Sequence, residues 1–297
     1  MIHIAIEVKM RIGIVFPQTE VSSNYSEVKE YAQFSEDIGY DHILAYDHIL
    51  GANADSRPGW RGAYRHTDTF YEPLILFSFL ASITKEIEFA TGVIILPQRQ
   101  TALVAKQAAT VDILSNGRLR LGIGTGWNEV EYEALNENFH DRGKRSEEQI
   151  ELLRLLWSKE LITFNGNHHT VTDAGINPLP IKQDIPIWFG GMVNAVLKRV
   201  ARMGDGWLPQ GEPDSEFMKK YDLLKKYLVE EGREASDIGI EGRISLNGLS
   251  DNEIIQKVKD WESVGASHLS INTMNSNLSF PKGHMKAISH VKKLIGN

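Results

Sequence analysis

The sequence predicts an α/β fold, a single (β/α)8 TIM barrel with an inserted segment. Short apolar runs of strand length alternate with helical segments eight times along the 297 residues. No linker or shift of composition interrupts this alternation, and eight such units in under 300 residues fit a closed barrel better than an open sheet. Polar, aromatic and glycine residues follow the strand ends, where barrels carry their active sites.

The first half of the chain supplies four strands and three helices. Asn24 and Glu27 mark the start of the first helix, and Gly39 ends it. The turn signal Ser115-Asn116-Gly117 separates the third helix from the fourth strand. The strands are expected over residues 11–16, 41–45, 87–94 and 118–123, and the later helices over 72–84 and 101–114.

The second half repeats this pattern around one departure. Residues 160–186 are polar and contain Pro178, Pro180 and Pro186, which predicts an inserted hairpin and loop. Ser250 followed by Glu253 is a capping box that opens a helix containing Trp261. The other helices are expected over 145–157, 194–203, 215–231 and 285–295, and the strands over 187–189, 206–208, 238–246 and 268–271. The long loop 49–71 and the insertion are the expected lids, and residues 1–9 read as an extension before the first strand.

Composition excludes several classes of function. A net charge of −7 argues against nucleic acid as a partner, and the absence of cysteine excludes disulfides, thiolate nucleophiles and cysteine-ligated metals. The ten histidines show no metal-binding spacing, and no serine lies in a nucleophile elbow. No apolar run is long enough to span a membrane and no signal peptide is seen, so a cytoplasmic protein without a membrane partner is expected.

The motif Gly122-Ile-Gly-Thr-Gly-Trp-Asn-Glu129 ends the fourth strand. Its glycines indicate that the backbone comes close to another group there. Its last three residues bring an aromatic face, an amide and a carboxylate to the strand end. It lacks the later glycine of a dinucleotide-binding fingerprint, so we reject a Rossmann interpretation.

Two other pairs lie at strand ends. Asp47 and His48 together suit general acid–base chemistry, since each can hold the protonation state of the other; the alternative is a loop histidine bonded to backbone. Gly190-Gly191 precedes a helix, where free N–H groups suit a phosphate; the alternative is a plain tight turn.

The cluster Arg142-Gly-Lys-Arg145 could attract an acidic cofactor tail or simply form a solvated helix face.

In combination these motifs resemble the bacterial luciferase-like oxidoreductase superfamily, over nearly the whole chain from Met10. The resemblance implies a barrel with an insertion that binds FMN or the deazaflavin coenzyme F420 at its rim. The motifs that carry it are Asp47-His48, Ala90-Thr-Gly-Val93, Leu114-Ser-Asn-Gly-Arg118, Gly122–Glu129, Ile187-Trp-Phe-Gly-Gly191 and Met203-Gly-Asp-Gly-Trp207.

The resemblance also implies roles for individual residues. Gly92 and Val93 correspond to a frequent non-proline cis peptide under the cofactor ring. His48 matches a proton-transfer residue of deazaflavin-dependent dehydrogenases, with Asp47 orienting it. Those enzymes place a glutamate directly after Gly-Thr-Gly, where this chain has tryptophan. The remaining expected cofactor contacts are Thr125, Gly126, Trp127 and Asn128 around the ring and side chain, and Gly190 and Gly191 at the phosphate.

These inferences predict an F420-dependent oxidoreductase that transfers a hydride to or from a small organic substrate. The alternatives are an FMN-dependent two-component monooxygenase fed by a separate reductase, and a non-catalytic flavin-binding barrel. A homodimer is expected because such barrels often dimerise. The aromatic residues of loop 49–71 suggest a partly apolar substrate, although core packing explains them equally well.

Overall fold

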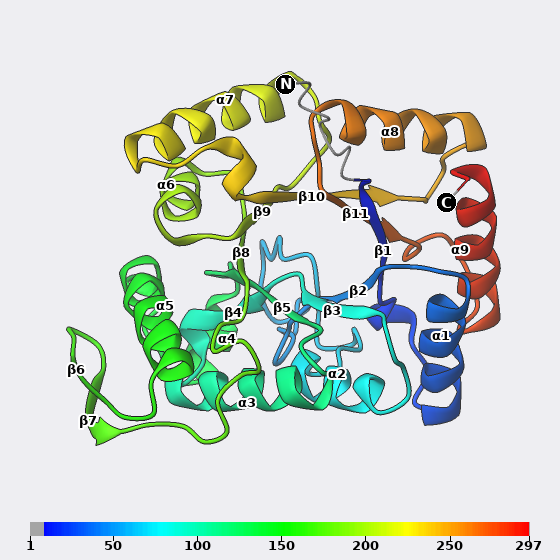
Figure 1. Ribbon diagram of the computed structural model, residues 1–297. Coiled ribbons are helices and arrows are strands. Elements are labelled where there is room, and N and C mark those ends of the chain that lie inside the picture. Colours follow the sequence, from blue (N-terminus) through cyan, green and yellow to red (C-terminus); the bar gives the residue numbers. More distant parts are fainter. Residues whose placement is uncertain (1–8, 297) are drawn as a thin grey trace.

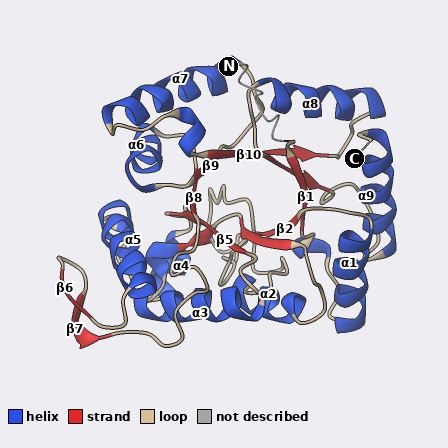
Figure 2. Cartoon of the chain, in the orientation of Figure 1, coloured by secondary structure: helices blue, strands red, loops and turns tan. Residues whose placement is uncertain are grey.

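A closed ring of parallel strands forms the centre of the computed structural model, which describes residues 9–296 (Figures 1 and 2). The order around the ring is β3-β2-β1-β11-β10-β9-β8-β5, and β3 pairs with β5 to close it. β4 also lies beside β5 and continues the line of β3. These strands are β1 (Arg11–Val15), β2 (His42–Ala45), β3 (Glu88–Thr91), β4 (Ile94–Ile95), β5 (Leu119–Gly124), β8 (Ile187–Gly190), β9 (Gly206–Leu208), β10 (Gly239–Ser245) and β11 (His268–Asn272).

Helices surround the ring and bury their apolar faces against it (Figure 2). The expected capping box of Ser250 and Glu253 is present, and Asn24 caps the first helix through Ser26 N–H. The described helices are α1 (Tyr25–Asp37), α2 (Pro73–Ala81), α3 (Thr101–Leu114), α4 (Glu129–Ala134), α5 (Arg142–Ser158), α6 (Asn194–Met203), α7 (Ser215–Glu230), α8 (Asp251–Ser263) and α9 (Lys282–Leu294). The predicted barrel is thus confirmed, with α4 as an additional short helix.

The strand expected over residues 87–94 is interrupted. The peptide bond between Gly92 and Val93 is cis, as the resemblance implied, and it separates β3 from β4. Both pieces pair with β5, Phe89 opposite Leu119 and Ile94 opposite Ile123. The interruption pushes Val93 out of the ladder at the carboxyl end of the barrel.

The inserted segment forms the predicted hairpin, β6 (Ile162–Asn165) paired antiparallel with β7 (Thr170–Ala174). Glu148 of α5 accepts hydrogen bonds from the backbone of Asn167 and His168 and from the ring of His169. The hairpin lies outside the ring of strands, beside α3 and α5 (Figure 1). Its described contacts are with these outer helices, so a lid role for it stays a prediction. Residues 1–8 of the expected extension lie outside the described residues.

The barrel interior is filled in layers from the amino ends of the strands. A buried polar group comes first: Glu241 of β10 pairs with Arg120 of β5 and with His42 of β2, whose Nε2 lies 2.8 Å from the carboxylate. An apolar layer lies above it. Its members are Val15, Leu44, Tyr46, Ala90, Trp188, Leu208 and Met274, with Phe70 and Val93 packed against them.

Candidate active site at the carboxyl ends of the strands

Val93 explains the glycines at the neighbouring strand ends. A Cβ on Gly124 would lie 2.5 Å from Val93 Cγ2, and one on Gly190 would lie 2.7 Å from Val93 Cγ1. Gly126, with φ of 65°, would place a Cβ 2.7 Å from Ile95. Side chains at Gly124 and Gly190 would therefore collide with Val93, and a side chain at Gly126 would collide with Ile95 of β4. The close approach predicted from sequence is real, and its partner within the protein is Val93.

His48 is held by a buried carboxylate. Its Nδ1 lies 2.9 Å from Oε1 of Glu131, and the same oxygen accepts the N–H of Ile49 at 3.1 Å. The second oxygen of Glu131 accepts from Gln98 Nε2 at 2.9 Å. Burial alone would raise the pKa of Glu131, but the hydrogen bonds from His48 and Gln98 outweigh it and hold that pKa below its ordinary value. Glu131 is therefore ionised, and it fixes Nδ1 of His48 as a protonated nitrogen that donates to the carboxylate.

Asp47 does not orient His48, and this part of the prediction is wrong. Its carboxylate accepts the N–H of Ile95 at 2.9 Å and Nη2 of Arg99 at 2.8 Å. Arg99 is shared with Glu72, 2.8 Å away at the start of α2. Asp47 thus ties the end of β2 to β4, directly after the cis peptide. Its contribution to the site is to position this strand.

Aromatic side chains enclose the ring of His48. The ring centroids of Tyr64 and Phe70, both in loop 49–71, lie 4.7 and 4.8 Å from it. Trp127 lies 5.7 Å away and remains 43% exposed. Trp60 contacts Trp127 at 5.8 Å. The loop after β2 therefore covers His48 with an apolar wall and leaves an indole face open at the rim.

The two glycines after β8 differ from the prediction in one respect. The N–H of Gly191 is not free, because it donates to the carbonyl oxygen of Leu208 at 3.2 Å. Its own carbonyl accepts the indole N–H of Trp207 at 2.7 Å. The open donors lie further on: Val193 precedes α6, no side chain caps this helix among the described residues, and its exposed first turn begins at Asn194. A phosphate at this end would meet the start of α6 rather than Gly191 N–H.

Two residues of the Gly-Thr-Gly-Trp-Asn-Glu segment, Asn128 and Thr125, serve the fold. Asn128 is buried and caps α4, its Oδ1 accepting Val130 N–H and its amide donating to the carbonyl of Leu50. It is thus a structural cap, and the cofactor contact expected of it stays a prediction. The carbonyl of Thr125 accepts the Tyr132 hydroxyl at 2.7 Å. Glu129 is exposed, and the carboxylate that reaches the site is Glu131.

The cluster Arg142-Gly-Lys-Arg145 carries no open anion site. Arg145 is buried and paired with Glu137 and Asp141 at 3.0 and 2.9 Å. The guanidinium of Arg142 stacks on Phe139 at 3.7 Å. The two arginines thus fix the first turn of α5, and only Lys144, which is exposed, matches the solvated helix face that the sequence left open.

The family described as luciferase-like monooxygenase matches residues 10–268. This match covers most of the chain and includes every strand of the barrel before β11, at whose first residue it ends. The chain belongs to the luciferase-like monooxygenase family.

Relatives of this luciferase-like protein differ in the cofactor that their names state. An uncharacterized protein of Mycobacterium tuberculosis is 36% identical over 67% of this chain, and the match spans 66% of that protein's own length. An F420-dependent glucose-6-phosphate dehydrogenase of Amycolatopsis mediterranei is 30% identical over 81% of this chain and 71% of its own. An FMNH2-dependent dimethylsulfone monooxygenase of Pseudomonas fluorescens is 29% identical over 56% of this chain and 45% of its own.

A solved structure supports the luciferase-like fold. An F420-dependent secondary alcohol dehydrogenase, in complex with an F420–acetone adduct, superposes with a TM-score of 0.79 over 97% of this chain and 99% of its own. The two sequences are 16% identical, so the likeness is one of fold.

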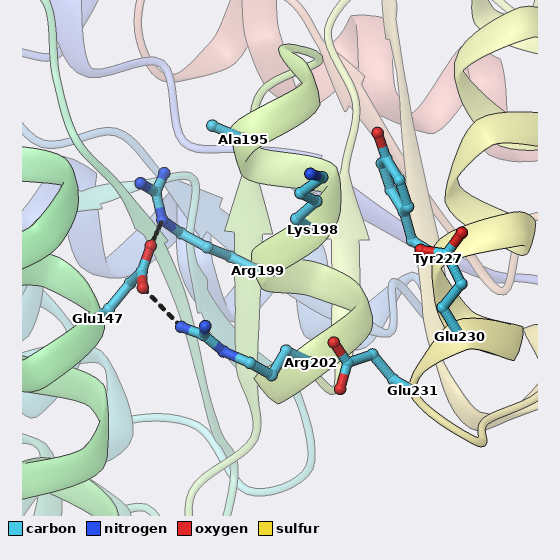
Figure 3. A pocket seen from close by; sticks show the side chains of 8 residues that line it. All are labelled: Glu147, Ala195, Lys198, Arg199, Arg202, Tyr227, Glu230 and Glu231. Atoms are coloured by element: carbon cyan, nitrogen blue, oxygen red, sulfur yellow. Dashed lines mark hydrogen bonds and ion pairs between the residues drawn. The ribbon is translucent and has the colours of Figure 1, made fainter.

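A hollow of this luciferase-like protein lies outside the barrel, between α5, α6 and α7 (Figure 3). Its volume is about 310 Å³. Glu147 holds both Arg199 and Arg202, at 2.8 and 2.6 Å. The charged groups that line it are three basic and three acidic, so it has no net preference for an anion: Glu147, Lys198, Arg199, Arg202, Glu230 and Glu231.

Within residues 9–296, no group of three or more histidine, aspartate or glutamate side chains could hold a metal ion. None of the described helices is long and apolar enough to cross a membrane.

Proposed function

We propose that this luciferase-like protein is a coenzyme F420-dependent oxidoreductase that transfers a hydride between the deazaflavin and a small organic substrate. The observation that carries the proposal is the pair of His48 and Glu131 on the rim, beside the exposed indole of Trp127. Hydride transfer to a carbonyl, or from an alcohol, needs one group that gives or takes a proton at the substrate oxygen. A histidine whose tautomer is fixed by a buried carboxylate suits this role.

The residues present fit a flat ring system with a phosphate-bearing side chain. Val93 stands out of the sheet on its cis peptide, and the glycines beside it leave no side chain above the strand ends. Val93, Gly126 and Trp127 would contact the ring. The uncapped start of α6 would meet the phosphate, with its dipole adding to the attraction.

A bound deazaflavin supplies the hydride acceptor or donor carbon. The side chains of the protein supply the proton exchange and exclude water. Nδ1 of His48 is occupied by Glu131, so the proton would be exchanged through Nε2, which has no hydrogen-bond partner among residues 9–296. Tyr64 and Phe70 would exclude water from that nitrogen.

The relatives support F420 over FMN. The F420-dependent dehydrogenase covers more of this chain than the FMNH2-dependent monooxygenase does, 81% against 56%. A fixed acid–base residue also suits hydride chemistry, in which the deazaflavin itself carries no proton to the substrate oxygen. The second candidate is an FMN-dependent monooxygenase, which the name of the family and the Pseudomonas relative favour. That enzyme would need a separate reductase as its partner.

Turnover of reduced F420 with an electron acceptor under strict anaerobiosis tests the residue assignment. His48→Ala should lower turnover about 10²–10⁴-fold, the usual contribution of a general acid or base, and leave F420 affinity nearly intact. His140→Ala, at an exposed histidine, is the matched control and should leave the rate unchanged. Equal rates in wild type and His48→Ala would refute the assignment. Oxygen-dependent activity with reduced FMN, and none with F420, would support the second candidate.

A further inference from the structure

Arg243 projects into the barrel from β10. Alternate residues of a strand face the same side, so Arg243 faces the interior like Glu241 two residues earlier, but one layer nearer the rim. Its Nη1 donates to the hydroxyl oxygen of Tyr46 at 2.8 Å. β10 and the strand before Tyr46, β2, are separated in the ring by β1 and β11. The hydrogen bond therefore crosses the interior, beneath the rim that carries His48.

Arg243 lacks a counter-ion, unlike Arg120, the other arginine that we place inside the barrel. Arg99, Arg120 and Arg145 each pair with at least one carboxylate. Within residues 9–296 no carboxylate lies within 4.0 Å of Arg243. Tyr46 does not supply a negative charge, since burial raises the pKa of its hydroxyl and Arg243 opposes this only in part.

The surroundings make this unpaired charge costly unless an anion joins it. The layer around Arg243 is apolar, with Val15, Leu44 and Leu208 among its members. A guanidinium there is only partly hydrated, so an anionic ligand would gain a strong, charge-assisted contact. Tyr46 accepts from Arg243, so its own hydroxyl hydrogen remains available to the same ligand.

Arg243 lies in the barrel interior beneath the aromatic side chains that enclose His48. Phe70 links the two: its ring lies 4.8 Å from that of His48, and it packs against the apolar layer that contains Tyr46. A small molecule between these groups would have one end on His48 and the other on the guanidinium.

From this geometry we infer that Arg243, with the hydroxyl of Tyr46, binds an oxyanion group of the substrate. The substrate class is thus a small molecule that carries a carboxylate or a phosphate besides its reacting carbon. The inference rests on the proposed function only in taking this end of the barrel as the substrate site. The competing source of the oxyanion is the cofactor, whose phosphate we place at the start of α6 instead.

The test is anion binding to the full-length protein without cofactor. Pyruvate and inorganic phosphate are titrated at constant ionic strength, with methyl pyruvate as the uncharged counterpart, and tryptophan fluorescence reports binding. We expect both anions to bind wild type and methyl pyruvate to bind more weakly. Arg243→Met should weaken both anions at least about tenfold, or about 1.4 kcal/mol. Tyr46→Phe should weaken them less, and Lys226→Met, on the exposed face of α7, should have no effect.

Two results would overturn the inference: anion binding that Arg243→Met leaves unchanged, or no anion binding to wild type. A third arm titrates F420 and FMN into wild type and Arg243→Met, and unchanged cofactor affinity is expected. Weaker cofactor binding with normal pyruvate binding would assign Arg243 to the cofactor instead. If Arg243→Met does not fold, Arg243→Lys keeps the charge but loses the planar fork, and it should still weaken pyruvate binding. Because the anion arm contains no cofactor, failure of F420 to bind would count against the proposed function and not against Arg243.

Discussion

Among single side chains, Glu131 determines what His48 can do. It has three hydrogen-bond donors around two oxygens, from His48, Ile49 and Gln98. An ionised carboxylate with donors on both oxygens can only accept hydrogen bonds, so the proton on Nδ1 of His48 stays in place. Nε2 is then the nitrogen that can exchange a proton with the substrate. Glu131 is a positioning residue, since it acts through His48.

Replacing Glu131 by Gln tests this role. The amide can donate as well as accept, so the fixed tautomer of His48 is lost, and anaerobic turnover with F420 should fall. The loss should be smaller than the roughly 10²–10⁴-fold expected of His48→Ala, because the imidazole remains. Cofactor affinity should not change. A Glu131→Gln enzyme with the wild-type rate would show that the carboxylate does not govern His48.

Stability adds an independent measure of Glu131. Its pKa is lowered in the folded protein, so its contribution to the free energy of unfolding is complete above its ordinary value of 4.5 and is lost as the pH falls through the folded value. The advantage of wild type over Glu131→Gln should therefore be present at pH 7 and shrink toward pH 3.

Between strands, the fit of Val93 against β5 and β8 is the contact that shapes the site. Gly124→Ala would place a methyl group 2.5 Å from Val93 Cγ2 and should destabilise the protein by about 1–3 kcal/mol, as overpacking does. The double variant Gly124→Ala/Val93→Ala removes the colliding methyl groups and should recover part of this loss. Urea denaturation of the four proteins of the cycle measures the coupling. Additive effects would mean that the two residues do not compete for space.

The elements themselves follow largely from sequence pattern. Apolar runs and capping residues predicted the eight strand–helix units, because burial against one core sets their periodicity. The hairpin was predicted from its prolines and polarity. The interaction partners of individual polar residues were predicted less well than the elements. Asp47 pairs with Arg99, 52 positions away, and such partners depend on how the strands close into a ring.

The short helix α4 was missed although its signal was present. Asn128 is followed three residues later by Glu131, the spacing of an N-cap and its first turn. Interpreting Asn128 as a cofactor ligand hid this pattern, and with it the buried carboxylate. The contact between Glu131 and His48 spans 83 positions and could not be inferred from spacing.

For the molecule as a whole, the buried polar layer at the amino ends of the strands should set the response to acid. Burial, with the positive charge of Arg120, lowers the pKa of His268 from 6.5 to about 2. Below pH 6.5, His268 is therefore protonated in the unfolded chain but not in the folded protein. The contribution of this group to stability is complete above that pH and falls by about 1.4 kcal/mol for each unit below it.

Urea denaturation at pH 7.5 and pH 5.5 checks this, with wild type compared to His268→Gln. The variant has no group that titrates at this position. Between pH 7.5 and pH 5.5 the unfolding free energy of wild type should therefore fall by about 1.4 kcal/mol more than that of His268→Gln. A difference that stays constant between the two values would show that His268 titrates alike in both states.

The measurement that tests the proposed function most directly is a parallel titration of the purified protein with F420 and with FMN, followed by tryptophan fluorescence. The exposed indole of Trp127 lies on the rim where the ring would bind. We predict saturable quenching by F420, with FMN at least about tenfold weaker, which is about 1.4 kcal/mol. Tighter binding of FMN than of F420 would contradict the proposal.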